Sequence, residues 1–86
     1  MDRVVAAQAA DEMLNISDIE ASVVLYPTAD GGVYMSARSI GSMNVQVLME
    51  KLGGGGNQSA AAVQISDVSV TEAESRLKAA IDEYLM

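Results

Sequence analysis

Four consecutive glycines, at positions 53 to 56, are followed by Asn57, Gln58 and Ser59. Glycine has no Cβ atom to keep a ligand away from the backbone, so successive N–H groups in such a run can converge on phosphate oxygens. The competing interpretation is a flexible Gly/Ser linker, which composition alone favours equally. A linker, however, would leave the apolar residues 60–65 with nothing to pack on. We therefore favour a loop that binds an anion.

Arg38 is the second residue that could contact a phosphate. It lies within the segment VYMSARS, residues 33–39, whose alternation places Tyr34, Ser36 and Arg38 on one face of an expected strand. An unpaired charge on a partly buried strand is costly, and the planar guanidinium fork suits a phosphate. The hydroxyls of Ser36 and Ser39 flank it. A salt bridge to one of the twelve acidic residues, or an exposed position on an edge strand, remains the alternative.

The composition excludes several kinds of chemistry. The chain has no cysteine and no histidine, which removes thiolate nucleophiles, disulfides, the commonest metal ligand and the commonest general base near neutral pH. The net charge of −7 opposes binding to long nucleic acids or anionic membranes. The expected ligand is therefore small and held locally. We identify no catalytic and no metal-binding residue.

Hydrophobic spacing and turn residues predict one α/β domain over residues 1–86, with helices packed on a small mixed sheet in the order αββαβα. Pro27 and two glycines in the segment 27–32 predict a chain reversal, which makes the first two strands antiparallel. The helix between the second and third strands allows a parallel crossover. The expected elements cover residues 3–14, 20–26, 33–39, 45–52, 60–66 and 71–86.

Capping residues mark the helix ends. Asn44 can cap the helix over 45–52, and Gly53 stands where a left-handed C-terminal cap is expected. Thr71 and Glu74 have the spacing of a capping box at the start of the last helix. No apolar run approaches the length of about 20 residues that a membrane span needs, so we expect a soluble domain.

The segment GVYMSARSIGSMNVQVLMEKLGGGGNQSAAAVQI resembles the DHH-associated domain of DHH-family phosphoesterases, most closely the C-terminal domain of bacterial cyclic-di-AMP phosphodiesterases. The motifs SARS, NVQV and GGGG, in this order, carry the resemblance, which covers nearly the whole chain. It implies that the chain is a C-terminal fragment of a larger protein.

The resemblance implies a division of labour in that parent protein. An upstream DHH domain holds two manganese ions and hydrolyses cyclic di-AMP to pApA, while the associated domain contacts the substrate and is not an enzyme by itself. Arg38 would pair with a substrate phosphate, and Gly54, Gly55 and Gly56 would let the backbone approach the nucleotide. The parent would be anchored in the bacterial membrane, with this domain in the cytoplasm and making no membrane contact itself. A homodimer is a further partner to consider.

One position departs from the family pattern. Members usually read GGGGH, whereas this chain reads GGGGN, with Asn57 where the histidine would contact phosphate or nucleotide. Asn can donate a hydrogen bond from its amide but cannot carry a positive charge. Two alternatives stay open: a domain for short RNA oligonucleotides (nanoRNA), and a non-catalytic interaction domain in which nucleotide binding has been lost.

Overall fold

The structure, a computed structural model, describes residues 12–16 and 20–86. From residue 20 onward the order is strand, strand, helix, strand, helix, and the predicted α/β class is confirmed. A very short additional strand precedes the last long one. The elements are β1 (Glu12–Ile16), β2 (Ala21–Pro27), β3 (Val33–Ser39), α2 (Val45–Glu50), β4 (Gly55–Gly56), β5 (Ala60–Ile65) and α3 (Val70–Leu85).

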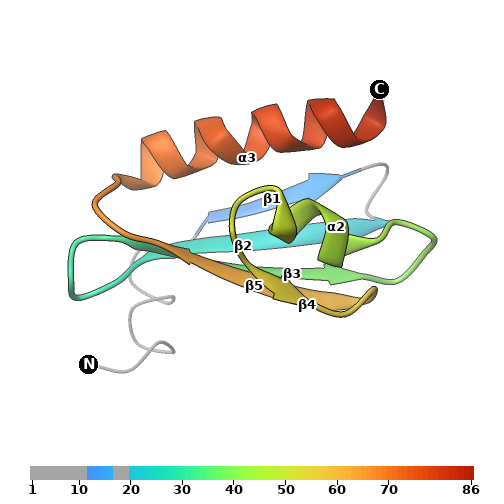
Figure 1. The fold of residues 1–86 in the computed structure, drawn as a ribbon, viewed down its shortest axis with the longest axis horizontal. Helices are drawn as coiled ribbons and strands as arrows, with labels where there is room; N and C mark the ends of the chain where they lie inside the picture. The colour runs from blue at the N-terminus through green and yellow to red at the C-terminus, as the bar shows by residue number, and fades with distance from the viewer. Residues whose placement is uncertain (1–11, 17–19) are drawn as a thin grey trace.

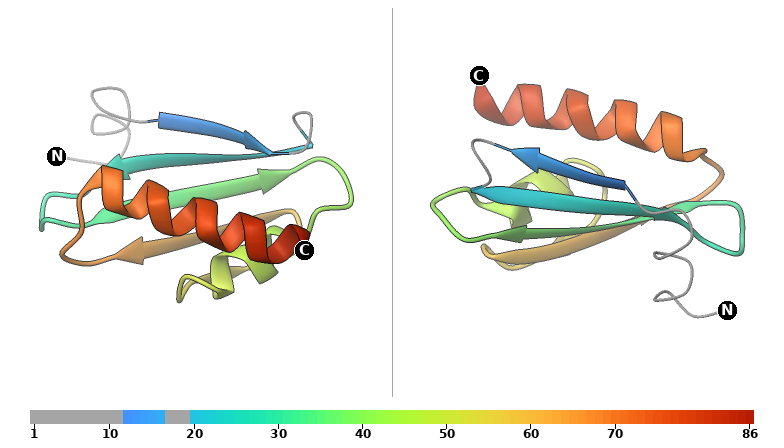
Figure 2. Two further views of the ribbon diagram at one scale, coloured as in Figure 1. Left: turned by 90° about the horizontal axis from the view of Figure 1, so that it is seen from above. Right: turned by 180° about the vertical axis from the view of Figure 1, so that it is seen from behind.

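The strands form one sheet in the order β1-β2-β3-β5-β4, and every neighbouring pair is antiparallel. Both helices pack on the same face of this sheet (Figures 1 and 2). We call the opposite face, on which the described residues place no helix, the open face. Strand β3 lies in the middle of the sheet, so its side chains alternate between the helix-covered face and the open face.

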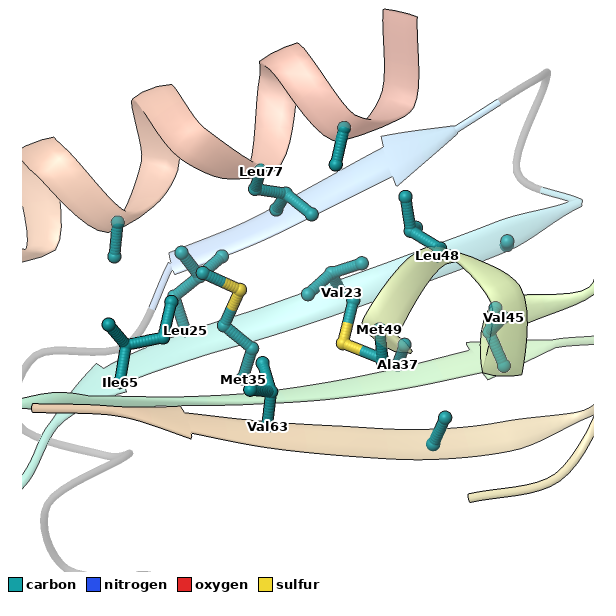
Figure 3. Packing of buried hydrophobic residues seen from close by; sticks show 14 of the residues in the cluster. Val23, Leu25, Met35, Ala37, Val45, Leu48, Met49, Val63, Ile65 and Leu77 are labelled. Atoms are coloured by element: carbon teal, nitrogen blue, oxygen red, sulfur yellow. The ribbon is translucent and has the colours of Figure 1, made fainter. Parts of the chain in front are cut away.

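The hydrophobic core lies between the sheet and the two helices (Figure 3). The predicted alternation in β3 is confirmed, because its odd-numbered residues 33, 35 and 37 are fully buried. The predicted apolar stripe of α3 is confirmed as well, with Ala73, Leu77 and Ala80 buried and Ile81 and Tyr84 partly buried against them. The largest fully buried side chains are those of Val23, Leu25, Val33, Met35, Val45, Leu48, Met49 and Leu77.

The predicted helix over residues 3–14 is wrong at its C-terminal end. Residues 12–14 belong to β1, which pairs antiparallel with β2 from Glu12 opposite Leu25 to Ile16 opposite Ala21. Pairing with a neighbouring strand satisfies the backbone groups of β2 and overrides a weak helical preference. Residues 3–11 lie outside the described residues.

The suggested parallel crossover is also wrong, since β3 and β5 are antiparallel. The helix in the connection is much shorter than the strand that precedes it. Helix α2 has six residues and so spans about 9 Å, whereas the seven-residue β3 spans about 23 Å. The helix therefore does not carry the chain back to the start of β3. The chain turns back instead, and Ser39 N donates to Ser59 O at 2.9 Å, at the end where β3 finished.

The helix caps agree with the sequence in α2 but not in α3. The Asn44 carboxamide oxygen accepts from the N–H groups of residues 46 and 47, at 3.0 and 3.3 Å, and Gly53 has φ of +97°, as predicted. Helix α3, in contrast, is capped by Ser69, whose hydroxyl oxygen accepts from Glu72 N at 3.0 Å. The predicted box from Thr71 to Glu74 is therefore two residues too late; Ser69 and Glu72 have the same spacing.

Candidate functional site

A shallow hollow of about 250 Å³ lies on the open face, where β3, β5 and β4 run side by side. Ser36 of β3, Ala62 of β5 and Gly55 of β4 are aligned partners across the three strands. Because all three are small, they leave a depression in the surface. The residues that line it are Tyr34, Ser36, Arg38, Gly55, Gly56, Ala60, Ala61 and Ala62.

Arg38 stands at one end of this hollow, opposite Ala60 in the register of β3 and β5. Its side chain is exposed, and β3 is an interior strand, so the edge-strand interpretation is wrong. Within the described ranges, Arg38 forms no ion pair; the cations that do are Lys51, with Glu83, and Arg76, with Glu72. Among these residues, therefore, no carboxylate competes for the Arg38 guanidinium.

The two predicted serines lie on opposite faces of β3. Ser36 is half-buried and lines the hollow beside Arg38. Ser39 is 9% exposed on the other face, where its hydroxyl oxygen accepts from Gly41 N at 3.3 Å. Ser39 follows Ser36 by three positions, an odd offset, so a strand with a period of two points the two side chains to opposite faces. Ser39 shapes the turn after β3 and does not join the site.

The glycine run does not form the predicted anion nest. Gly53 N donates to Glu50 O at 3.1 Å and Gly54 N donates to Met49 O at 2.9 Å, so both amides close the end of α2. Asn57 N donates to Ala60 O at 2.7 Å, while residues 55–56 pair with β5 as strand β4. The N–H groups of Gly53, Gly54 and Asn57 thus serve the chain's own backbone, so the run does not offer a full set of amides converging on one external point.

The three predicted glycines have different structural reasons for lacking a side chain. A Cβ at Gly54 would collide with the backbone oxygen of Ala62, and Gly54 does not line the hollow. Gly56 has φ of +148°, and a Cβ there would collide with Ala61. At Gly55, in contrast, a Cβ would meet nothing within 4 Å. Gly55 is the glycine whose missing side chain keeps the hollow open without being needed by the fold.

Asn57 shapes the turn between β4 and β5. Its carboxamide oxygen accepts from Ser59 N at 3.0 Å, Ser59 Oγ at 3.3 Å and Ala60 N at 2.9 Å. The residue is exposed and does not line the hollow. A contact between Asn57 and a phosphate stays a prediction, and it would have to use the carboxamide nitrogen.

Tyr34 and residues 60–62 of β5 line the hollow but were not among the predicted site residues. The sequence carried the signal for both. Alternation in β3 puts Tyr34 on the same face as Arg38, and the run of three alanines at 60–62 indicates a strand whose surface leaves room for something else. Small residues contribute to a binding site through the space that they leave, and not through polar groups of their own.

The turn that follows β3 is held by Glu20, which directly precedes β2. Its carboxylate accepts from Ser42 Oγ at 2.9 Å and from Met43 N at 2.8 Å. Hydrogen bonds to the charged form, first from the Ser42 hydroxyl and then from the Met43 amide, lower the pKa of Glu20 below its ordinary value. The anchor fixes the turn next to the end of the strand that carries Arg38.

The described residues contain no group of three Asp or Glu side chains placed to hold a metal ion, and the sequence offers no His or Cys. The residues present here therefore do not fit a manganese centre. In residues 12–16 and 20–86, neither helix is long and apolar enough to cross a membrane.

The whole chain, residues 1–86, matches the family described as the DHHA1 domain. The chain belongs to the DHHA1 domain family. Three curated relatives named cyclic-di-AMP phosphodiesterase have similar sequences. This DHHA1 domain is 53% identical over 96% of its length to GdpP of Geobacillus thermodenitrificans, 54% over 94% to PdeA of Listeria monocytogenes, and 52% over 96% to GdpP of Bacillus subtilis. It spans only 12% to 13% of the length of those proteins.

A more distant relative comes from Aster yellows witches'-broom phytoplasma. Its name is membrane protein–large ribosomal subunit bL9 fusion protein, and it is 36% identical over 84% of this chain, which spans 8% of that protein. DHHA1-like sequence thus occurs as a small part of long chains in both groups of relatives.

Proposed function

We propose that this DHHA1 domain binds substrate for a longer DHH-family phosphodiesterase that hydrolyses cyclic di-AMP to pApA. The observation that carries the proposal is the position of Arg38, exposed and without a carboxylate partner in the described residues, at the end of a hollow with a floor of small residues. The names of the three relatives support the choice of ligand, since each is a cyclic-di-AMP phosphodiesterase.

The chemistry of the hollow suits a small phosphate ester. A guanidinium offers two parallel N–H donors to phosphate oxygens, and such charge-assisted hydrogen bonds are stronger than neutral ones. The net charge of −7 repels polyanions at long range, so a single exposed arginine favours a ligand with few phosphates over a long nucleic acid. Ser36, half-buried beside it, adds a hydroxyl that can donate to the same phosphate.

Hydrolysis belongs to the remainder of the parent protein in this proposal. Manganese would be held by the upstream DHH domain, because the residues described here do not fit a metal centre. That metal supplies an activated water, while this domain holds and orients the substrate with Arg38 and Ser36. The membrane anchor would also lie elsewhere in the parent, which agrees with the word membrane in the name of the phytoplasma relative.

A short linear oligonucleotide is the alternative ligand. The hollow is shallow and open, so it does not by itself require a cyclic molecule. Titrating the domain with cyclic di-AMP, pApA and a three-nucleotide RNA distinguishes the two possibilities. Tighter binding of the cyclic dinucleotide supports the proposal, and tighter binding of the RNA supports the alternative.

The role of Arg38 is tested by calorimetric titration of the Arg38→Ala variant with cyclic di-AMP. Hydrogen bonds to charged groups contribute about 1.5–3 kcal/mol, so we expect the affinity to fall about tenfold or more. Lys78→Ala is the matched control, because Lys78 is an exposed cation on α3, away from the hollow. Equal affinities for wild type and Arg38→Ala would overturn the proposed site. Absence of binding by the wild type would favour an interaction domain without a nucleotide.

A further inference from the structure

The hollow has two chemically different ends. Tyr34, Ser36 and Arg38 occupy alternate positions of β3 and all line it, so a charged group stands at one end and an aromatic ring at the other. Their Cα atoms extend over four residue steps, about 13 Å along a strand. The hollow is therefore a directional surface, with its polarity set by the course of β3.

Tyr34 is held in place at its end. It is half-buried, and its ring packs against that of Tyr26 with centroids 5.3 Å apart and planes tilted by 39°. Tyr26, its aligned partner on β2, is itself only 7% exposed. A ring supported in this way loses little conformational freedom when a flat ligand stacks on it.

The middle of the hollow holds no large side chain. Ser36, Ala62 and Gly55 form one aligned row across three strands, and the space above Gly55 is open. A sugar-sized group can therefore lie between the two ends without displacing protein atoms. Charge, empty floor and aromatic ring follow one another in the same order as the phosphate, ribose and base of a nucleotide.

We propose that a nucleotide lies along β3 with its phosphate at Arg38 and its base stacked on Tyr34, which makes Tyr34 the residue that distinguishes a nucleotide from a simple sugar phosphate. This inference rests on the proposed function, because it assigns a direction to the ligand of the same hollow. Stacking on an aromatic side chain does not depend on base identity, since every base has a π-face.

The test compares AMP with ribose 5-phosphate, which lacks the base, in calorimetric titrations of the 86-residue chain. Replacing Tyr34 by Leu keeps an apolar side chain but removes the π-face, so AMP affinity is expected to fall about fivefold or more. The affinity for ribose 5-phosphate should stay unchanged. Tyr34→Phe keeps the ring and should bind AMP as the wild type does. Arg38→Ala should weaken both ligands.

The results separate this inference from the proposed function. If Arg38→Ala weakens AMP binding and Tyr34→Leu does not, the base lies elsewhere and the inference fails while the site survives. If the wild type binds cyclic di-AMP but neither AMP nor ribose 5-phosphate, the inference fails and the proposed function survives; if it binds none of the three, both fail. A measurement on the unmutated chain keeps the test valid even if Tyr34→Leu misfolds. The ring current of the stacked adenine should shift the ring-proton NMR signals of Tyr34 when AMP binds. Unchanged Tyr34 signals at saturation would overturn the inference.

Discussion

Gly54 and Gly55 are neighbours in the sequence, yet substituting alanine at each should produce opposite results. A Cβ at Gly54 would collide with the backbone oxygen of Ala62 and approach the Val63 Cα to 2.9 Å. Backbone atoms in the middle of a sheet cannot move aside as a flexible side chain can. At Gly55 the same atom would meet nothing within 4 Å.

The expected magnitudes follow from these contacts. Overpacking costs about 1–3 kcal/mol, so Gly54→Ala should lower Tm by about 4–8 °C for each kcal/mol lost in a domain of this size. Gly55→Ala should leave the free energy of unfolding unchanged or raise it by up to about 1 kcal/mol, because alanine restricts the unfolded chain. The new methyl group enters the hollow, however, and should weaken cyclic di-AMP binding about tenfold, as one misplaced methylene does in a pocket.

Thermal unfolding followed by circular dichroism measures the first effect, and calorimetric titration of the folded variants measures the second. We expect Gly55→Ala to be stable but to bind poorly, and Gly54→Ala to be destabilised. A Gly55→Ala variant that binds as the wild type does would refute the role of Gly55 in keeping the hollow open. A Gly54→Ala variant of full stability would refute the close approach of residue 54 to β5.

Two further predictions concern the turns that flank the hollow. Asn57→Ala removes the acceptor of three hydrogen bonds in the β4–β5 turn, so the free energy of unfolding should fall by about 1–2 kcal/mol in denaturant titrations, whereas Asn57→Asp, which keeps an oxygen acceptor, should lose less. Because the folded pKa of Glu20 lies below its ordinary value of 4.5, its hydrogen bonds to the turn at 42–43 stabilise the fold above that pH and are lost as the pH falls through the folded pKa. The free energy of unfolding, measured at several pH values between pH 6 and pH 3, should thus fall less steeply for Glu20→Gln than for wild type. An equal fall in both proteins would contradict this role.

The strands with strong alternation were predictable from sequence, because a period of two that separates apolar from polar residues has one simple structural solution. The burial of Val33, Met35 and Ala37 and the opposite position of Arg38 followed from this pattern alone. Ser39 belongs to the same pattern, and strict use of the alternation would have removed it from the site.

Other features depended on partners distant in the chain. Residues 12–14 have a local helical preference, and only pairing with β2 makes them a strand. The glycine run has the composition of an anion-binding loop, but the Gly53 and Gly54 amides find acceptors in α2 and residues 55–56 pair with β5, and a sequence does not show which carbonyls will be near. The separate reasons for Gly54, Gly55 and Gly56 likewise appear only when the neighbouring strand is placed beside them.

NMR titration of the isotope-labelled chain with cyclic di-AMP can show whether the hollow on the open face is the nucleotide site. We expect the backbone signals of Ser36, Arg38, Gly55 and Ala62 to shift together with one dissociation constant. Signals of the exposed side of α3, such as that of Lys78, should stay in place. Shifts confined to α2 and α3, with the signals of the hollow unchanged at saturation, would contradict this expectation.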